Sequence, residues 1–588
     1  MSVSFSSRQR LAMLGQYIRP YWRPAVLGIV ALLAVNGVGV VLPLLIRTCV
    51  DDVQDGLGFG DVVRYSALIL GLASVMWVIR MASRVLLFGV GRKVEFDLKQ
   101  RLFEHLLRLE PTYFANMPLG DLINRATSDV ESIRRLVGFA VLSLVNTIFA
   151  YVLTLPLMLA IDPLLSLAAL AVYPILLLLV QLFSQRLRQE QQDVQEELSE
   201  ISQLIQEDMS GISLIKIYAQ ESNERAAFGR LNQKLLKSNL KLTKTRNVLF
   251  PLLEGLASFS LLILLWLGGQ AIEGNRITVG DLIALILYVE RLVFPTALLG
   301  FTITAFQRGE VSVDRIEEIL QHPPLIQDVP EALVVPPSEL TGAIKVDGLT
   351  IHYPGQPQPA LSNISFMVQP GETIAIVGPI GSGKSTLANA LPRLLDVPTD
   401  SIFLDGLDIT QLSLNSLRRA IAYVPQDSFL FSLPIRDNIR YGNPEVSEAE
   451  IIAAAQQAQI DREILNFPRR YDTLVGERGI TLSGGQRQRT ALARALLLQA
   501  PVLILDDALA SVDNQTATQI LQALNGDRDR QRTVIFISHQ LAAAATADRI
   551  LVLDRGHLVQ SGSHRELLAT DGLYRSLWER QQLEELCA

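Results

Sequence analysis

One short segment of the chain combines glycines, a lysine and hydroxyl residues at a spacing that suits phosphate binding. An apolar stretch over 373–377 leads into Gly378, Pro379, Ile380, Gly381, Ser382, Gly383, Lys384, Ser385 and Thr386. This is the pattern G-x-x-x-x-G-K-[ST], and a helical pattern follows it. The glycines let backbone N–H groups point into one concavity, to which the helix start adds partial positive charge. Lys384 can reach the β- and γ-phosphates of a nucleotide, and the Ser385 hydroxyl can ligate Mg²⁺.

A second apolar stretch, 501–505, ends in two adjacent carboxylates, Asp506 and Asp507. Buried strands do not normally end in two acids without a cation nearby, because an unpaired buried charge is costly. Asp506 therefore suits the shell of a Mg²⁺ ion. The alternative is a cap at the start of a helix. The occurrence of the phosphate-type loop in the same chain favours the metal over the cap.

Between these segments, Ser483, Gly484, Gly485 and Gln486 precede another helical pattern. A serine and two glycines ahead of a helix form an N-terminus that suits an anion. The chain therefore has two phosphate-type helix starts, near residues 384 and 484.

Six apolar stretches in the first half reach the ~20 residues that a membrane crossing requires. They cover 25–46, 62–90, 136–161, 163–183, 248–270 and 279–303. Because they lack the regular polar positions of a soluble core helix, we interpret them as membrane spans. Glu290 and Arg291 lie near the middle of the sixth span, where ionisable groups usually face a cavity or a partner helix. A static ion pair between helices is the alternative to a cavity.

The charges around the first span orient all six. Arginines without acidic residues precede this span, whereas Asp51, Asp52 and Asp61 follow it. The positive-inside rule therefore predicts a cytoplasmic N-terminus. The long charged segments 91–135 and 184–247 then lie on the same side, and the helices are expected to continue into them. We interpret the first residues as an amphipathic helix at the inner membrane surface rather than a transit peptide.

The composition limits the function further. The 588 residues are 49% hydrophobic and 19% charged, with a net charge of −7. The acidic excess lies after residue 320, which argues against a nucleic-acid partner because such a partner calls for a basic face. Cys49 and Cys587 match no disulfide or metal-ligand spacing. Prolines between 322 and 340 mark a linker, after which alternating short strands and helices predict an α/β domain.

Together these motifs resemble those of ATP-binding cassette (ABC) proteins. The phosphate loop, Gln426 after a strand, the serine–glycine helix start, Asp506 and His539 occur together in that family. With six spans before them, the chain is identified as a half-size ABC exporter of the multidrug or lipid type. The resemblance implies an α-helical polytopic membrane domain with six transmembrane helices, fused to an α/β P-loop nucleotide-binding domain. The expected parts are 1–24, a cytoplasmic elbow segment; 25–310, the transmembrane domain with two cytoplasmic coupling helices; 311–340, a linker; and 341–588, the nucleotide-binding domain.

The resemblance also implies roles for individual residues. Tyr353 matches the aromatic residue that stacks on adenine, Gln426 a residue that touches Mg²⁺, and His539 the γ-phosphate contact. On their own, Tyr353 would be a core-strand tyrosine and His539 a structural histidine. The segments 113–125 and 209–216 resemble the two coupling helices. The segment 475–479 resembles the sensor of the opposing coupling helix, and 510–513 resembles the loop that crosses the dimer interface, although Ala510 replaces the usual serine.

Asp507 departs from the family pattern. Active members carry a glutamate here, which orients and deprotonates the attacking water. Basicity hardly changes, because the model acidities differ by about 0.4 units. The position of the carboxyl group changes more, since aspartate is one methylene shorter and extends less far toward the attacking water. A ~1 Å misplacement can cost ~10²-fold in rate. We expect slow hydrolysis at this catalytic position and a heterodimer whose partner carries the glutamate; a homodimer with two slow sites is the alternative.

The resemblance finally implies cofactors, partners and location. ATP and Mg²⁺ are the expected cofactors, and a second half-transporter, membrane lipids and a hydrophobic or amphipathic substrate are the expected partners. The N-terminus and the nucleotide-binding domain are expected in the cytoplasm, at the plasma (inner) membrane if the source is bacterial. Six spans exclude a soluble nucleic-acid ATPase of the same family, and the fused order disfavours an importer. The sequence does not exclude an ATP-gated channel or a receptor regulator as an alternative function. A conductance measurement would distinguish these from an exporter.

Overall fold

The computed structural model describes residues 6–587 except 55, 57, 354, 477, 478, 480, 511, 513 and 527–531. The chain divides into two compact units. The first comprises Met1–Leu107 and Pro118–His322, and the second comprises Arg108–Met117 and Pro323–Ala588.

The first unit is helical. Its elements are α1 (Ser7–Ile18), η1 (Arg19–Tyr21), α2 (Trp22–Gln54), α3 (Phe59–Leu106), α5 (Leu119–Asn124), η2 (Arg125–Asp129), α6 (Val130–Arg135), η3 (Leu136–Ala140), α7 (Val141–Ile161), α8 (Pro163–Leu170), α9 (Tyr173–Ser210), α10 (Ile212–Ile217), α11 (Glu221–Glu273) and α12 (Val279–Leu320). Among the described residues, six helical stretches are long and apolar enough to cross a membrane: Arg8–Val53, Phe59–Leu106, Leu119–Ile161, Pro163–Ser210, Glu221–Glu273 and Val279–Leu320. The prediction of six spans is confirmed.

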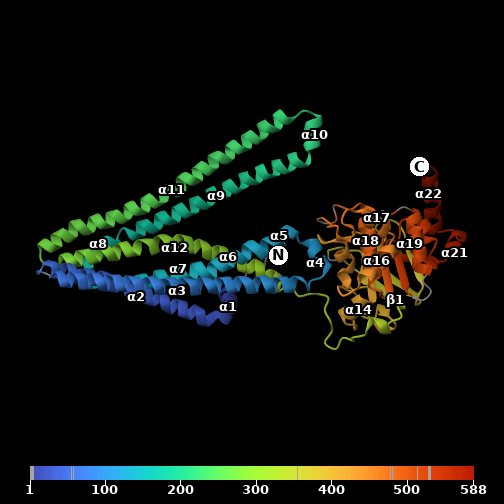
Figure 1. Ribbon diagram of the computed structural model, residues 1–588, viewed down its shortest axis with the longest axis horizontal. Coiled ribbons are helices and arrows are strands. Elements are labelled where there is room, and N and C mark those ends of the chain that lie inside the picture. The colour runs from blue at the N-terminus through green and yellow to red at the C-terminus, as the bar shows by residue number, and fades with distance from the viewer. Residues whose placement is uncertain are drawn as a thin grey trace. The chain divides into compact units, whose positions relative to one another are not determined.

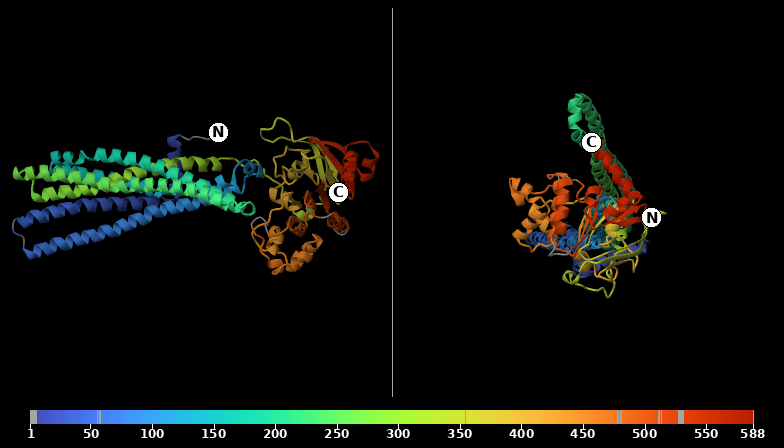
Figure 2. Two further views of the ribbon diagram at one scale, coloured as in Figure 1. Left: turned by 90° about the horizontal axis from the view of Figure 1, so that it is seen from above. Right: turned by 90° about the vertical axis from the view of Figure 1, so that its right-hand side faces the viewer.

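Several helices continue far beyond their apolar stretches, as the sequence predicts. α3 runs on to Leu106, α9 runs on to Ser210, and α11 begins at Glu221. α2 packs along α3, and α9 packs along α11, as Figures 1 and 2 show. α12 continues to Leu320, into the stretch where the sequence predicts a linker. The second coupling segment falls on the end of α9 and on α10.

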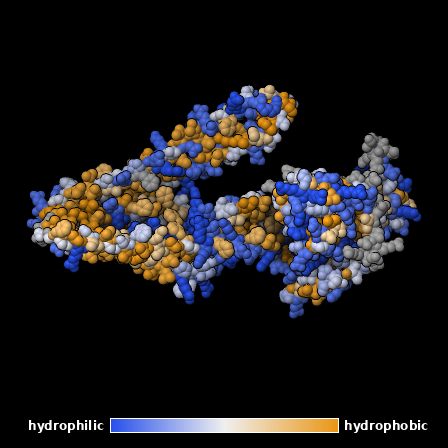
Figure 3. All heavy atoms as spheres, viewed as in Figure 1, coloured by the Kyte–Doolittle hydropathy of each residue, from blue (hydrophilic) through white to orange (hydrophobic). Residues whose placement is uncertain are grey.

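Large apolar side chains remain exposed on the helical unit. Leu70, Trp77 and Val85 of α3 are 70%, 68% and 63% exposed. Figure 3 shows hydrophobic residues, in orange, over much of this unit. A surface of this size and composition requires lipid or another subunit against it.

The second unit contains two sheets. The larger sheet has the order β10-β9-β3-β8-β7-β6, in which every neighbouring pair is parallel except β9 and β10. Its strands are β3 (Thr373–Val377), β6 (Ile421–Val424), β7 (Val502–Asp506), β8 (Thr533–Ile537), β9 (Arg549–Asp554) and β10 (His557–Gly562). The smaller, antiparallel sheet has the order β2-β1-β4-β5, with β1 (Ile344–Ile351), β2 (Leu361–Val368), β4 (Ile402–Leu404) and β5 (Leu407–Asp408).

Helices complete this unit. They are α4 (Pro111–Asn116), η4 (Pro337–Glu339), α13 (Lys384–Ala390), α14 (Leu414–Ala420), α15 (Ile435–Ile439), η5 (Arg440–Gly442), α16 (Glu448–Gln457), α17 (Asp461–Asn466), η6 (Arg470–Asp472), α18 (Gly484–Leu497), α19 (Asn514–Gly526), α20 (Leu541–Ala544), α21 (His564–Ala569) and α22 (Leu573–Cys587). β3, β7 and β8 are buried at every residue, as expected for parallel strands covered on both faces. The predicted α/β fold is confirmed.

Gly309 allows a close helix crossing in the first unit. A Cβ at this position of α12 would lie 2.2 Å from Leu136 Cδ1 and 2.6 Å from Leu136 Cβ. We predict that Gly309→Ala destabilises the protein by about 1–3 kcal/mol, because Leu136 is buried and cannot move aside freely. Thermal unfolding of the purified protein in detergent measures this effect.

Gly229 of α11 supplies the matched control, since a Cβ there would meet nothing within 4 Å. Gly229→Ala should leave stability unchanged or raise it by up to ~1 kcal/mol through better helix propensity. Equal melting temperatures for the two variants would contradict the close-crossing argument.

Candidate functional site

The phosphate-type loop connects the central strand β3 to α13. Gly378 (φ 151°) and Gly383 (φ 98°) adopt positive φ angles. A Cβ at Gly378 would lie 2.0 Å from the Leu553 carbonyl oxygen, and one at Gly383 would lie 2.7 Å from Leu361 Cδ2. Both positions therefore require glycine, and the resulting loop leads directly into the first turn of α13.

Lys384 lies inside this loop. Its ammonium group donates to the carbonyl oxygens of Gly378 (3.0 Å) and Pro379 (2.9 Å). Burial lowers the pKa of Lys384, while Asp507 and Asp506 act in the opposite direction. Within the described part of the chain, the closest acceptors of this buried cation are neutral oxygens, which favours an anionic ligand.

Asp506 and Ser385 face each other across the same space. The Ser385 hydroxyl donates to Asp506 Oδ1 (3.0 Å), and the Tyr423 hydroxyl donates to Asp506 Oδ2 (3.2 Å). Burial raises the pKa of Asp506, and the two hydroxyl hydrogen bonds oppose this shift. The sequence did not reveal Tyr423 as a contact of Asp506. Its only signal is its place in β6, the parallel neighbour of β7.

These oxygen donors fit Mg²⁺ that arrives with a nucleotide. No group of three or more His, Cys, Asp or Glu side chains forms a metal site among the described residues. Mg²⁺ usually takes one or two protein oxygens and completes its shell with phosphates and water. Ser385 and Asp506 supply such a pair, and Gln426 lines the same cavity. Bound there, Mg²⁺ would neutralise charge on the phosphates.

Asp507 lies beside Asp506 with an unusual backbone conformation. Its φ angle is 50°, in the left-handed region, and its N–H donates to the Ile537 carbonyl oxygen (3.2 Å). Burial raises the pKa of Asp507, and His539 opposes the shift. The Asp507 carboxyl group therefore keeps its proton up to a higher pH than an ordinary aspartate does.

The loop and the strand ends enclose a cavity of about 740 Å³. Of the predicted site residues, it is lined by Tyr353, Ile380, Gly381, Ser382, Gly383, Lys384, Ser385, Thr386, Gln426, Asp506, Asp507 and His539. Gly378 and Pro379 contribute through the carbonyl oxygens that hold Lys384. The lining also includes Gln356, Gln358 and Arg555, which no sequence signal indicated.

The second phosphate-type helix start lies elsewhere in this unit. Ser483, Gly484, Gly485 and Gln486 are absent from the described lining of the cavity and begin α18. Ser483 and Gln486 form a capping box, in which the Ser483 hydroxyl accepts from Gln486 N–H (3.3 Å) and the Gln486 side chain accepts from Ser483 N–H (2.9 Å). Gln486 Nε2 also donates to Glu463 (2.8 Å). The structure therefore places this predicted nucleotide contact outside the chain's own cavity.

Two further predicted segments lie partly outside the described residues. The sensor segment 475–479 includes 477 and 478, and the loop 510–513 includes 511 and 513. The first coupling segment, 113–125, is divided between α4 of the second unit and α5 and η2 of the first.

Comparisons with known proteins cover both units. A family model described as the ABC transporter transmembrane region matches residues 25–296, and one described as ABC transporter matches residues 361–510. The probable multidrug resistance ABC transporter ATP-binding/permease protein YheI of Bacillus subtilis (strain 168) is 32% identical over 577 residues, which are 97% of this chain and 98% of that protein. A putative multidrug export ATP-binding/permease protein of Staphylococcus aureus (strain NCTC 8325 / PS 47) is 32% identical over 576 residues, 97% of this chain and 99% of that protein.

A solved structure is similar over almost the whole chain. The structure of a bacterial Atm1-family ABC exporter with ATP bound matches with a TM-score of 0.76 and 27% identity. The match covers 96% of this chain and 99% of that one.

Lys384 provides the direct test of the cavity. We predict that Lys384→Ala weakens ATP binding at least about tenfold, because a charge-assisted contact to phosphate is lost. Titration of the purified protein with a fluorescent ATP analogue measures the affinity. Lys345→Ala is the matched control, since Lys345 is an exposed lysine of β1 outside this cavity. Equal affinities for the two variants would contradict the assignment of the cavity to ATP.

Proposed function

Because this chain belongs to the ABC transporter family, as an exporter-type half-transporter, we propose that it exports or flips hydrophobic or amphipathic compounds, including drugs, by alternating access. The observation that carries this proposal is the union, in one chain, of six membrane-crossing helices with a cavity built around Lys384 and Asp506. The names of the two bacterial relatives support the multidrug class. Transport of a fluorescent drug into vesicles, with and without ATP, tests it.

The separation of the two phosphate-type helix starts supports a head-to-tail dimer. Lys384 begins the helix that borders the cavity, whereas Ser483 begins a helix whose N-terminus does not. A helix N-terminus with serine and glycines binds anions best when its N–H groups point at them. In a dimer, the α18 start of each half would complete the ATP site of the other half. Closure of that sandwich would then drive the membrane helices from inward-facing to outward-facing.

Asp507 supports an asymmetric dimer. Its carboxylate is one methylene shorter than the glutamate expected of an active member, so it reaches the attacking water poorly. The intact start of α18 can nevertheless serve a partner's site. We therefore infer a heterodimer in which this chain's own site binds ATP and hydrolyses it slowly, while the partner carries glutamate at the equivalent position. A homodimer with two slow sites is the second candidate.

The chain is a multi-pass integral membrane protein, and we further propose its orientation. Arg8, Arg10, Arg19 and Arg23 precede the apolar part of the first span, which favours a cytoplasmic N-terminus. Six spans would return the chain to that side, so we propose a cytoplasmic ATP site. The bacterial relatives favour the plasma membrane as the location. A gated channel would instead show electrical conductance in a planar bilayer.

Ser483 tests the head-to-tail arrangement. We predict that Ser483→Ala lowers nucleotide trapping at the partner's site and spares trapping at this chain's own site, because α18 faces the partner. Photolabelling with azido-ATP, followed by separation of the two subunits, measures each site. Ser447→Ala is the matched control, because Ser447 forms the same kind of capping box at the start of α16. Loss confined to this chain's own site would contradict the sandwich.

Asp507 tests the asymmetry. We predict that Asp507→Asn leaves most ATP turnover of the purified assembly intact, whereas Glu→Gln at the partner's equivalent position lowers turnover by roughly 10²-fold. Steady-state phosphate release measures both variants. Asp507→Glu should add hydrolysis at this chain's own site, because the longer side chain restores reach. Strong activity from this chain alone that disappears in Asp507→Asn would show that Asp507 is a working base.

A further inference from the structure

A second cavity lies between α11 and α12 of the membrane unit. Its volume is about 730 Å³, within the range of drug-binding pockets. Aliphatic and aromatic side chains such as Leu261, Val293 and Phe294 form most of its lining. Two carboxylates, Glu254 of α11 and Glu290 of α12, are its only charged lining residues among those described.

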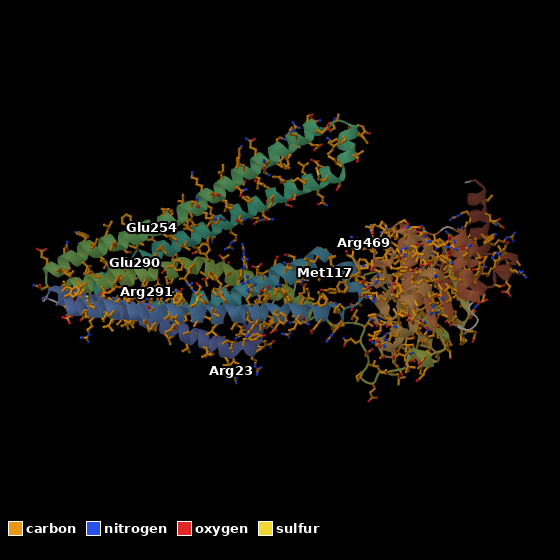
Figure 4. All side chains as sticks on the ribbon, viewed as in Figure 1. Arg23, Met117, Glu254, Glu290, Arg291 and Arg469 are labelled. Atoms are coloured by element: carbon orange, nitrogen blue, oxygen red, sulfur yellow. The ribbon has the colours of Figure 1, made fainter. Side chains whose placement is uncertain are left out.

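The two glutamates are separated along the cavity. The lining spans residues 253–264 of α11 and 286–301 of α12, and these consecutive helices run antiparallel. Glu254 lies near the end marked by Phe301, whereas Glu290 lies nearer the end marked by Ile286. At 1.5 Å per residue, their backbone positions are roughly 10–15 Å apart along the helix axes. Figure 4 shows Glu254 on α11 and Glu290 on the adjacent α12.

No basic side chain compensates these carboxylates within the described part of the chain. Arg291, the neighbour of Glu290, turns to α2, where its guanidinium donates to the carbonyl and side-chain oxygens of Asn36 (3.2 Å each). Gly39 of α2 leaves room for the Arg291 guanidinium, since a Cβ at this position would lie 1.9 Å from Arg291 Nη1. The described residues form no hydrogen bond or ion pair with the carboxyl group of Glu254 or Glu290, and the Ser258 hydroxyl donates to the backbone carbonyl oxygen of Glu254 (3.0 Å). The described residues therefore offer no ion-pair partner for Glu290, and no basic side chain among them faces either carboxyl group in the cavity.

We propose that this cavity binds bulky organic cations, with Glu254 and Glu290 as counter-charges, an inference that rests on the proposed export function and names its substrate class. Ionisable groups within membrane spans usually mark a substrate or ion path. A metal ion needs its oxygen ligands within a few ångströms of one centre, which residues roughly 10 Å apart along the axes do not provide. A cation with an apolar body matches both the lining and the charge, and Phe294 and Phe301 add aromatic faces.

Tetraphenylphosphonium and tetraphenylborate test this inference, because they share size and shape and differ in the sign of charge. Equilibrium binding of each radiolabelled ion to the purified transporter in nanodiscs is measured without ATP. We expect Glu254→Gln and Glu290→Gln each to weaken phosphonium binding about tenfold or more. Binding of the borate should not weaken. Glu273→Gln is the matched control, because Glu273 lies at the exposed end of α11 outside the cavity.

A second measurement shows whether the cavity is open to ligand in the assembly. The chain has only two cysteines, so Cys49→Ser and Cys587→Ser give a background for Ser258→Cys, a lining position. Phosphonium should slow maleimide labelling of this cysteine. An unreactive cysteine that phosphonium does not affect would show that a helix of the second subunit fills the cavity, which overturns the proposal.

The outcomes separate this inference from the function on which it rests. Unchanged phosphonium binding in Glu254→Gln/Glu290→Gln overturns the cation site, even if ATP-driven transport of other compounds is found. Equal weakening of both ions also overturns it, because a change in packing rather than in charge would then be responsible. If phosphonium binding depends on the glutamates but no ATP-driven transport is found, the proposed export function is overturned, whereas the cation site is supported.

Discussion

The common carboxyl edge of the parallel strands is the constraint on which the nucleotide site depends. β8 lies between β3 and β7 and pairs with both in fixed register. Ile537 of β8 lies opposite Ile376 of β3 on one side and opposite Asp506 of β7 on the other. Parallel strands end at the same edge, so the loop after β3, Asp506 of β7 and His539 after β8 meet at one cavity. A slip of one residue would send Asp506 to the other face and away from Ser385. The buried sheet core therefore fixes the chemical geometry.

The membrane unit obeys a different constraint, because lipid offers its backbone no hydrogen-bond partners. Continuous helices satisfy their backbone groups internally, which is why α3, α11 and α12 each run without interruption through their apolar stretches. Rigid helices of this length turn a small change at one end into a large displacement at the other. Long rigid helices of this kind suit the alternating access that we propose.

Local patterns made much of this molecule predictable, and non-local contacts account for what was missed. The phosphate loop, the strand ending in Asp506 and the six apolar stretches each carry their chemistry in consecutive residues. By contrast, Tyr423 meets Asp506, and Gln486 meets Glu463, only through the packing of separate elements. The sequence placed Glu290 near mid-membrane and left its direction open. Only the packing of the helices shows that these two neighbours have different surroundings. Glu290 lines the cavity with Glu254 of α11, whereas Arg291 contacts Asn36 of α2.

Asp507 shows how a backbone requirement and a catalytic requirement can conflict at one residue. The turn after β7 holds this residue at φ 50°, where most side chains are strained. Aspartate tolerates this region better than glutamate, because its short polar side chain can hydrogen-bond locally. An aspartate therefore relieves the turn at the expense of reach toward the attacking water. In the heterodimer that we propose, a subunit that binds ATP and completes its partner's site tolerates this exchange, whereas a subunit responsible for turnover would lose its rate. An aspartate at 507 is therefore compatible with the division of labour that we propose between the two halves.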